Sequence, residues 1–129
     1  MIYPQTTLTV LDNSGVNTIK CIQVTRKHYK YFGSTGSLIK ATVVSLKKTK
    51  KKSTLSVGDV VSALVVRTKK NKSSNGFYYS FYLNCAVLLS KSTPITQVQP
   101  LGSRISGPLL FYFKNKYYSK VLSLSKKLV

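Results

Sequence analysis

The segment Val60 to Val66 is apolar on both faces of an extended chain, and this restricts the folds available to the sequence. In a strand, Val61, Ala63 and Val65 would share one face, and Val60, Leu64 and Val66 would share the other. Such a strand must be covered on two sides. We therefore expect it to be the central element of a packed β structure.

Other short strands are expected on either side of this segment. Leu38 to Leu46 alternates apolar and polar residues, and Thr7 to Val24 reads as two strands around the turn Asp12-Asn13-Ser14-Gly15. Asn75-Gly76 precedes an aromatic strand, Phe77 to Tyr82, and a further strand covers Cys85 to Leu89. Many short strands with little helix predict a mainly β fold, a small barrel with a protruding β-ribbon.

The length of 129 residues suits one domain with one core, residues 1–129. We place the barrel at about residues 1–107 and a tail at about residues 108–129. Short helices are expected in that tail, with Pro108 at a first helical position.

The charge balance indicates the partner. The chain has 21 Lys and Arg against two acids, Asp12 and Asp59, for a net charge of +19. Basic side chains that neutralise phosphates release counterions, so nucleic acid is the expected partner, although charge alone does not separate DNA from RNA. An anionic membrane is the main rival. Membrane insertion is not expected, since no apolar run approaches the roughly 20 residues that span a bilayer.

The basic residues gather in three segments and in a basic C-terminal tail. One segment is the lysine loop, Lys47 to Lys52, which holds five lysines. The second, Arg67 to Lys72, follows the end of a strand. The last segment is Arg26 to Gly36, in which basic and aromatic residues are interleaved. The rings of that last segment fit two roles equally, stacking on bases or capping the barrel core. The residues expected to bind RNA are Lys20, Arg26, Lys27, Lys30, Lys47, Lys48, Lys50, Lys51, Lys52, Arg67, Lys69, Lys70 and Lys72.

Catalytic and metal chemistry are poorly supported. Two distant Asp and one His provide neither a carboxylate pair nor a base beside a nucleophile. Cys21 and Cys85 lack further ligands at metal spacing, and we expect both to be buried. We therefore expect that the protein is not an enzyme and that it binds no metal, cofactor or small-molecule substrate. Asp12 and Asp59 lie in turns, where a carboxylate accepts backbone N–H bonds.

A second function class fits the same residues. A free-standing barrel that binds single-stranded nucleic acid would also interleave basic and aromatic side chains. Composition and spacing alone leave this alternative open.

In order along the chain, a set of short motifs resembles the universal large-subunit ribosomal protein family numbered fourteen, over essentially the whole length. Gly58-Asp59-Val60-Val61, followed by Val65-Val66-Arg67-Thr68-Lys69-Lys70, is the most specific part. The others are Met1-Ile2, Val10-Leu11-Asp12-Asn13-Ser14-Gly15, Lys20-Cys21-Ile22, Ala63, Asn84, Val87-Leu88-Leu89, Gly102-Ser103-Arg104-Ile105, Gly107-Pro108 and Lys120.

The resemblance implies a five-stranded barrel with a projecting ribbon and a short C-terminal helical region. It implies binding to large-subunit ribosomal RNA near the subunit interface, contact with small-subunit RNA in a bridge, and neighbouring large-subunit proteins. It also implies a silencing factor that docks to block subunit joining. Its docking positions fall on Ser103, Arg104 and Lys120, with Ser in place of the usual Thr.

Two departures from the family pattern are informative. The ribbon and tail carry rings where the family has charges, so we expect Tyr78, Tyr82 and Phe111 to contact protein. Only three of the 21 basic residues are Arg, a bias typical of A+T-rich coding in organelles. Together with the bacteria-like motifs and the lack of an import signal, this favours a mitochondrial ribosome over a plastid or a bacterial cytoplasm.

Overall fold

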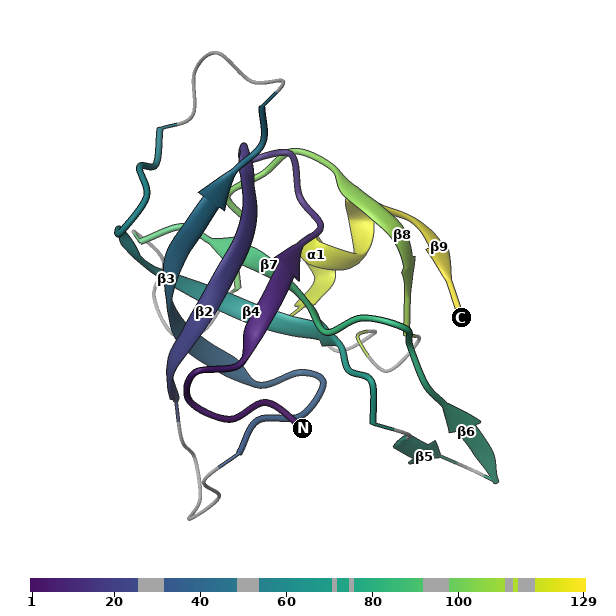
Figure 1. Ribbon diagram of the computed structural model, residues 1–129. Helices are drawn as coiled ribbons and strands as arrows, with labels where there is room; N and C mark the ends of the chain where they lie inside the picture. Colours follow the sequence, from purple (N-terminus) through teal and green to yellow (C-terminus); the bar gives the residue numbers. More distant parts are fainter. Residues whose placement is uncertain are drawn as a thin grey trace.

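The computed structural model is shown in Figure 1. It describes residues 1–25, 32–48, 54–70, 76–91, 98–110, 113 and 118–129, together with the backbone of residues 72–74.

Five strands form a closed barrel, as predicted. Each strand pairs antiparallel with the next, and a parallel pairing of the first with the last (Thr9 with Cys85, Val10 with Ala86) closes the barrel. In barrel order the strands are β1 (Thr7–Val10), β2 (Val16–Val24), β3 (Leu38–Leu46), β4 (Val60–Arg67) and β7 (Cys85–Leu89). The predicted turn between β1 and β2 is confirmed, with Gly15 at a φ of 96°.

Strand alternation sets which side chains fill the barrel. Ile19 pairs with Val43 and both are buried, whereas the adjacent pair, Lys20 and Thr42, is outside the core. Neighbouring residues point to opposite faces, so in β2 and β3 one face lines the core and the other meets solvent.

The strand β4 is buried on two sides over most of its length. Val61, Ala63 and Val65 face the barrel core, while Leu64 and Val66 pack in a second core with C-terminal residues. The prediction of a doubly covered strand is therefore confirmed, except at Val60, which is exposed. Val60 lies at the start of the strand, outside the reach of the second core.

The second core lies under the C-terminal part of the chain. There β8 (Ile105–Leu109) pairs in parallel with β9 (Ser125–Leu128), and α1 (Ser119–Ser123) lies between them in sequence. Val121 and Phe113 are fully buried against Leu64, Val66 and Val87. Figure 1 shows this layer of β8, α1 and β9 on one side of the barrel.

The tail departs from the expectation for Pro108. This residue lies in β8, paired with Lys127 at a register shift, and does not begin a helix. A shift disrupts the ladder, which is where a residue without an N–H is tolerated in a sheet. The boundary near residue 107 and the single domain stay predictions; β8 runs across that boundary.

The predicted ribbon is present as β5 (Lys72–Ser74) and β6 (Phe77–Tyr79), an antiparallel pair projecting from the barrel. Gly76 turns the chain with a φ of 80°. The aromatic strand ends at Tyr79 and not at Tyr82, because the backbone N–H of Phe81 donates to Thr68 O (3.2 Å) back at the barrel.

Both cysteines are free and buried, as expected. Burial raises the pKa of the Cys21 thiol. Burial also raises the pKa of Cys85, with Arg67 acting in the opposite direction.

Candidate nucleic-acid interface

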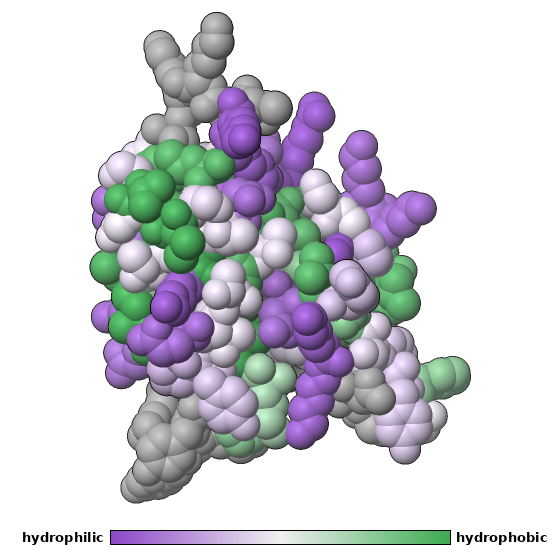
Figure 2. Space-filling view, in the orientation of Figure 1, coloured by the Kyte–Doolittle hydropathy of each residue, from purple (hydrophilic) through white to green (hydrophobic). Residues whose placement is uncertain are grey.

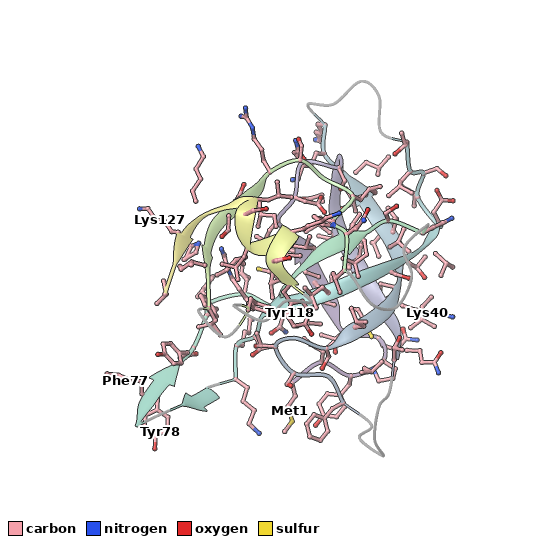
Figure 3. The ribbon with its side chains drawn as sticks, turned by 180° about the vertical axis from the view of Figure 1, so that it is seen from behind. Met1, Lys40, Phe77, Tyr78, Tyr118 and Lys127 are labelled. Carbon is pink, nitrogen blue, oxygen red and sulfur yellow. The ribbon has the colours of Figure 1, made fainter. Side chains whose placement is uncertain are left out.

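The exposed basic side chains lie on several sides of the barrel and on the C-terminal layer. In Figure 3, Lys40 and Lys127 point away from the body of the protein at opposite sides. Across the described ranges, the exposed cations are Lys20, Lys40, Lys48, Lys69, Lys70, Lys91, Arg104, Lys120, Lys126 and Lys127. Such a distribution offers many phosphate contacts without one deep site.

The two acids of the sequence are both bound to backbone N–H groups, as expected. Asp12 is buried and accepts from Ser14 N (3.0 Å) and Leu88 N (2.9 Å). Asp59 accepts from Ser56 N (2.8 Å), and this bond is the main cause of its lowered pKa. Both carboxylates therefore act within turns and leave the positive surface largely uncompensated.

Asn13 connects the first turn to residues 103 and 104. Its Oδ1 accepts from Ser103 N (2.8 Å) and from Arg104 N (3.3 Å), and its Nδ2 donates to Ser103 Oγ (2.7 Å). The sequence pattern indicates only a turn residue at Asn13. Its partners are about 90 positions away, so no local pattern could have found this role.

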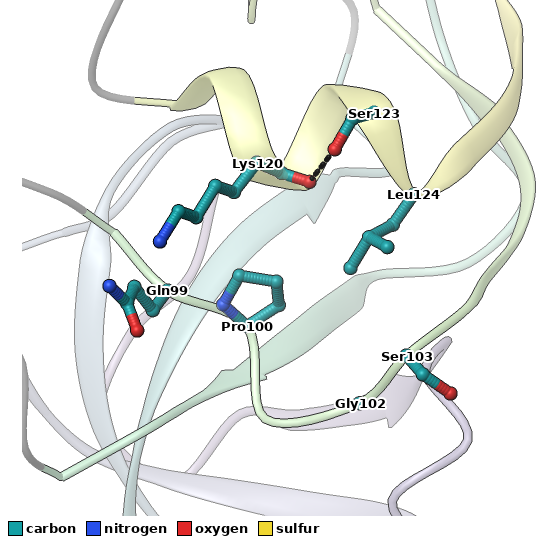
Figure 4. A pocket seen from close by; sticks show the side chains of 7 residues that line it. All are labelled: Gln99, Pro100, Gly102, Ser103, Lys120, Ser123 and Leu124. Atoms are coloured by element: carbon teal, nitrogen blue, oxygen red, sulfur yellow. Dashed lines mark hydrogen bonds between the residues drawn. The ribbon is translucent and has the colours of Figure 1, made fainter.

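Ser103 and Lys120 line one shallow hollow of about 320 Å³, together with Gln99, Pro100, Gly102, Ser123 and Leu124. Figure 4 shows Lys120 reaching from α1 over Gln99 and Pro100, with the Ser103 side chain at the other end of the hollow. Arg104 is the exposed residue next to Ser103. The three positions of the predicted docking face are thus on adjoining segments, because Ile105 N bonds Leu124 O (3.3 Å).

Two of the predicted RNA-binding residues are used within the protein. Lys47 is half-buried and donates from Nζ to Asp12 O (2.8 Å). Arg67 donates from Nε to Pro108 O (2.9 Å) and from Nη2 to Ser106 O (3.0 Å), and its guanidinium lies 5.4 Å from the Phe81 ring centroid. Both side chains hold segments together.

The strand exit after Arg67 keeps its cations outside. Lys69 and Lys70 are exposed, and the backbone of Lys69 is held by Asn84 Oδ1 (2.9 Å, from Lys69 N) and Ser80 Oγ (2.9 Å, to Lys69 O). The fixed backbone presents these two ammonium groups beside the base of the ribbon.

The ribbon rings are exposed. Tyr78 is 76% and Tyr82 is 90% exposed, and Phe77 and Tyr78 lie at the ribbon tip in Figure 3. Several predicted site residues lie outside the described residues, namely Arg26, Lys27, Lys30, Lys50, Lys51, Lys52 and Phe111, as does the Lys72 side chain.

The described residues contain neither a metal site nor a membrane-spanning helix. They contain no group of three His, Cys, Asp or Glu that could hold a metal ion. They also contain no helix long and apolar enough to cross a membrane.

Comparison with known families identifies the chain. Residues 1–129 match the family model described as ribosomal protein L14p/L23e. The chain belongs to this family. As an L14p/L23e protein it is a structural, non-enzymatic constituent of the large ribosomal subunit that binds ribosomal RNA and neighbouring ribosomal proteins. The barrel expected from the resemblance is confirmed, and ribosomal RNA is the polyanion that this basic protein binds.

Proposed function

We propose that this L14p/L23e protein lies at the subunit-joining face of the large subunit, with Ser103, Arg104 and Lys120 directed at the partner. The observation that carries the proposal is the Asn13 side chain, which fixes the backbone N–H groups of both Ser103 and Arg104. The Ser103 hydroxyl and the backbone of Ser103 and Arg104 are ordered before binding and lose little freedom on it, so contacts made there are favourable.

Two ligands are proposed for this face: small-subunit ribosomal RNA in a bridge, and a ribosome-silencing factor that prevents bridging. Arg104 and Lys120 are exposed cations on adjoining segments, suited to phosphate or to carboxylate. A factor that covers these groups would remove the contacts that small-subunit RNA needs.

The double substitution Arg104→Glu plus Lys120→Glu tests this face. We expect it to weaken binding of the silencing factor and subunit joining by at least about tenfold each, measured by pull-down and by gradient sedimentation of reassociated subunits. The matched control is Lys126→Glu plus Lys127→Glu, which changes the net charge equally on β9. Undiminished binding in the first variant, or equal loss in both, would contradict the proposal.

We propose that large-subunit RNA is bound by the remaining predicted cations. The exposed side chains of Lys20, Lys48, Lys69 and Lys70 support this. For a further set of cations, RNA binding is proposed from the sequence alone: Lys50, Lys51, Lys52, Arg26, Lys27, Lys30 and Lys72. Lys47 and Arg67 are proposed to bind RNA in addition to making their internal bonds.

Replacing Lys48, Lys50, Lys51 and Lys52 by Gln tests the lysine loop. Each lost phosphate contact should flatten the slope of log affinity against log salt by roughly 0.7 to 0.9. RNA binding measured from low to moderate salt reports this slope. An unchanged slope would exclude the loop from the RNA interface.

The exposed rings Tyr78 and Tyr82 are proposed to contact a protein neighbour, as is Phe111. Rings left in water reduce solubility, so the exposure of Tyr78 and Tyr82 in the free chain supports a covering partner. Hydroxyl-radical footprinting should show Tyr78 and Tyr82 protected in assembled subunits and reactive in the free protein. Equal reactivity in both states would contradict this proposal.

A mitochondrial ribosome is the proposed location. The support is the sequence bias, three Arg among 21 basic residues. Imaging of the tagged chain against mitochondrial and plastid markers, with recovery of the tag in organelle ribosomes, tests the assignment.

A further inference from the structure

The outer face of the barrel carries a group of exposed aliphatic residues that RNA binding does not use. We name Ile22, Val44, Val57 and Val60 the aliphatic patch; each is between 46% and 61% exposed. All four are β-branched, and three lie on the strands β2, β3 and β4.

The strand register places Ile22, Val44 and Val60 on three neighbouring strands, and Val57 lies in the turn before β4. Thr42 pairs with Val60, and Val43 is bonded to the next turn through Val43 N to Asp59 O and Gly58 N to Val43 O, both 2.9 Å. These bonds bring the turn with Val57 beside Val44. The strand β2 lies on the other side of β3. There Lys20 pairs with Thr42 and Cys21 pairs with Ala41, and Ile22 is the next residue of β2. Figure 2 shows apolar colour gathered on the barrel over β3 and the start of β4.

This patch is not explained by the polyanion. A single exposed valine is ordinary, but a cluster of aliphatic side chains on a water-facing sheet gains free energy only when another apolar surface covers it. The sugar–phosphate backbone of RNA is polar and charged and offers no such surface, and base faces stack on rings and not on branched aliphatic side chains, which favours a protein as the cover.

The charges around the patch indicate what kind of protein. Lys20, Lys40 and Lys91 are exposed near it: Lys20 and Lys40 lie in the same strands, and Lys91 lies near Asp59. The one nearby acid, Asp59, is bonded to Ser56 N and lies close enough to Lys91 for that charge to lower its pKa. A second copy of this chain would bring another net charge of +19 and be repelled.

We propose that the aliphatic patch docks a segment of a neighbouring ribosomal protein in which aliphatic side chains are flanked by Asp or Glu. The aliphatic residues cover the valines and Ile22, and the carboxylates meet the surrounding lysines. This docking site depends on membership of the large subunit and not on the proposed bridge, so either can fail without the other.

Photocrosslinking in purified large subunits tests the proposal directly. With p-benzoylphenylalanine placed at position 44 or at position 60 of the full chain, we expect both positions to crosslink to the same protein segment, containing aliphatic residues with Asp or Glu within a few positions. The control is the same group at position 69, which should crosslink to ribosomal RNA. Crosslinks from 44 and 60 to RNA, to a second copy, to a segment without acids, or to nothing would overturn it.

A smaller substitution tests the proposal if the bulky probe prevents assembly of the subunit. Val44→Thr plus Val60→Thr keeps the shape of the side chains and replaces one methyl of each with a hydroxyl. In competition with the unchanged protein for incorporation into large subunits, we expect a loss of roughly tenfold. The melting temperature and RNA affinity of the free chain should not change, and Val129→Thr, an exposed valine elsewhere, should compete equally. Equal incorporation of the double variant would refute the docking site.

Discussion

At the scale of single residues, the first turn is fixed by contacts from distant parts of the chain. Asp12 accepts from Leu88 N on the neighbouring strand β7, and Asn13 holds Ser103 and Arg104. Gly102 lies against both: a β-carbon there would lie 2.7 Å from Asn13 Oδ1 and 2.8 Å from Asp12 Cβ. This position has room only for glycine.

We predict that Gly102→Ala lowers the free energy of unfolding by roughly 1–3 kcal/mol, because the turn must shift to admit the methyl group. Urea denaturation measures the change. Gly33→Ala is the control, since its β-carbon would meet neighbours at 3.4 Å or more, an ordinary contact. Equal effects of the two substitutions would contradict the crowding argument.

A second residue-scale prediction concerns Asp59. Its folded pKa is lowered from 3.8, first by the Ser56 backbone N–H, then by the Ser56 side chain, and also by the Lys91 charge. Its contribution to stability is therefore present well above pH 3.8 and is lost as the pH falls through the lowered folded value. The difference in melting temperature between the protein and Asp59→Asn should shrink on acidification. A difference in melting temperature that grows on acidification would contradict this prediction.

At the scale of elements, Arg67 attaches the C-terminal layer to the barrel. Its guanidinium, on β4, bonds two carbonyl oxygens of β8, at Ser106 and Pro108, and covers Phe81. A lysine cannot reach both carbonyls with a planar group.

We predict that Arg67→Lys destabilises the protein by about 2 kcal/mol, the range for hydrogen bonds made by a charged group. Hydrogen exchange should speed up at Ser106 N and Val129 N, which bond Leu11 O and Leu109 O. The amide of Val43, in the barrel, should keep its protection relative to these two. Uniform acceleration at all three sites would show that Arg67 supports the whole fold and not this layer.

The barrel strands were predictable from the sequence, whereas in the C-terminal layer only the short helix α1 was. Leu38 to Leu46 and Thr7 to Val24 carry an alternating pattern that reflects their own burial. In contrast, β9 reads Ser-Lys-Lys-Leu and becomes a strand only through its pairing with β8, which lies about 20 residues earlier. The helical prediction for Pro108 was wrong for the same reason, because its place in β8 depends on that distant partner.

At the scale of the whole molecule, positive charge opposes folding and favours RNA binding. The net charge of +19 makes the free chain repel itself, and its two acids are engaged in turns. Added salt screens both effects.

We therefore predict opposite salt dependences for the two equilibria. The melting temperature of the free chain should rise between low and moderate sodium chloride, while its affinity for ribosomal RNA falls. Thermal denaturation and filter binding in the same buffers measure the pair. The lysine-loop variant with Gln at 48, 50, 51 and 52 should show a smaller rise. A melting temperature that falls with salt would refute self-repulsion as the main electrostatic influence on folding.

The residues of the candidate interface were predictable from the sequence, but the contacts of their side chains were not. The sequence identifies every cation, and yet it treats Lys47 and Arg67 like the exposed Lys69 and Lys70. Their difference arises from carbonyl oxygens that folding brings near, at Asp12, Ser106 and Pro108. Whether a cation also bonds within the protein therefore depends on the tertiary neighbours of its side chain.

The parallel contact between β1 and β7 also imposes an order of events during synthesis. Thr9 and Val10 must wait for Cys85 and Ala86, and Asp12 for Leu88, before the barrel can close. A nascent chain that has emerged only as far as β4 has two unpaired edges, at β1 and at β4, which are able to pair with other strands. Closure therefore comes late in translation, and a chain interrupted between residues 68 and 84 is an open sheet that already carries every lysine of the lysine loop.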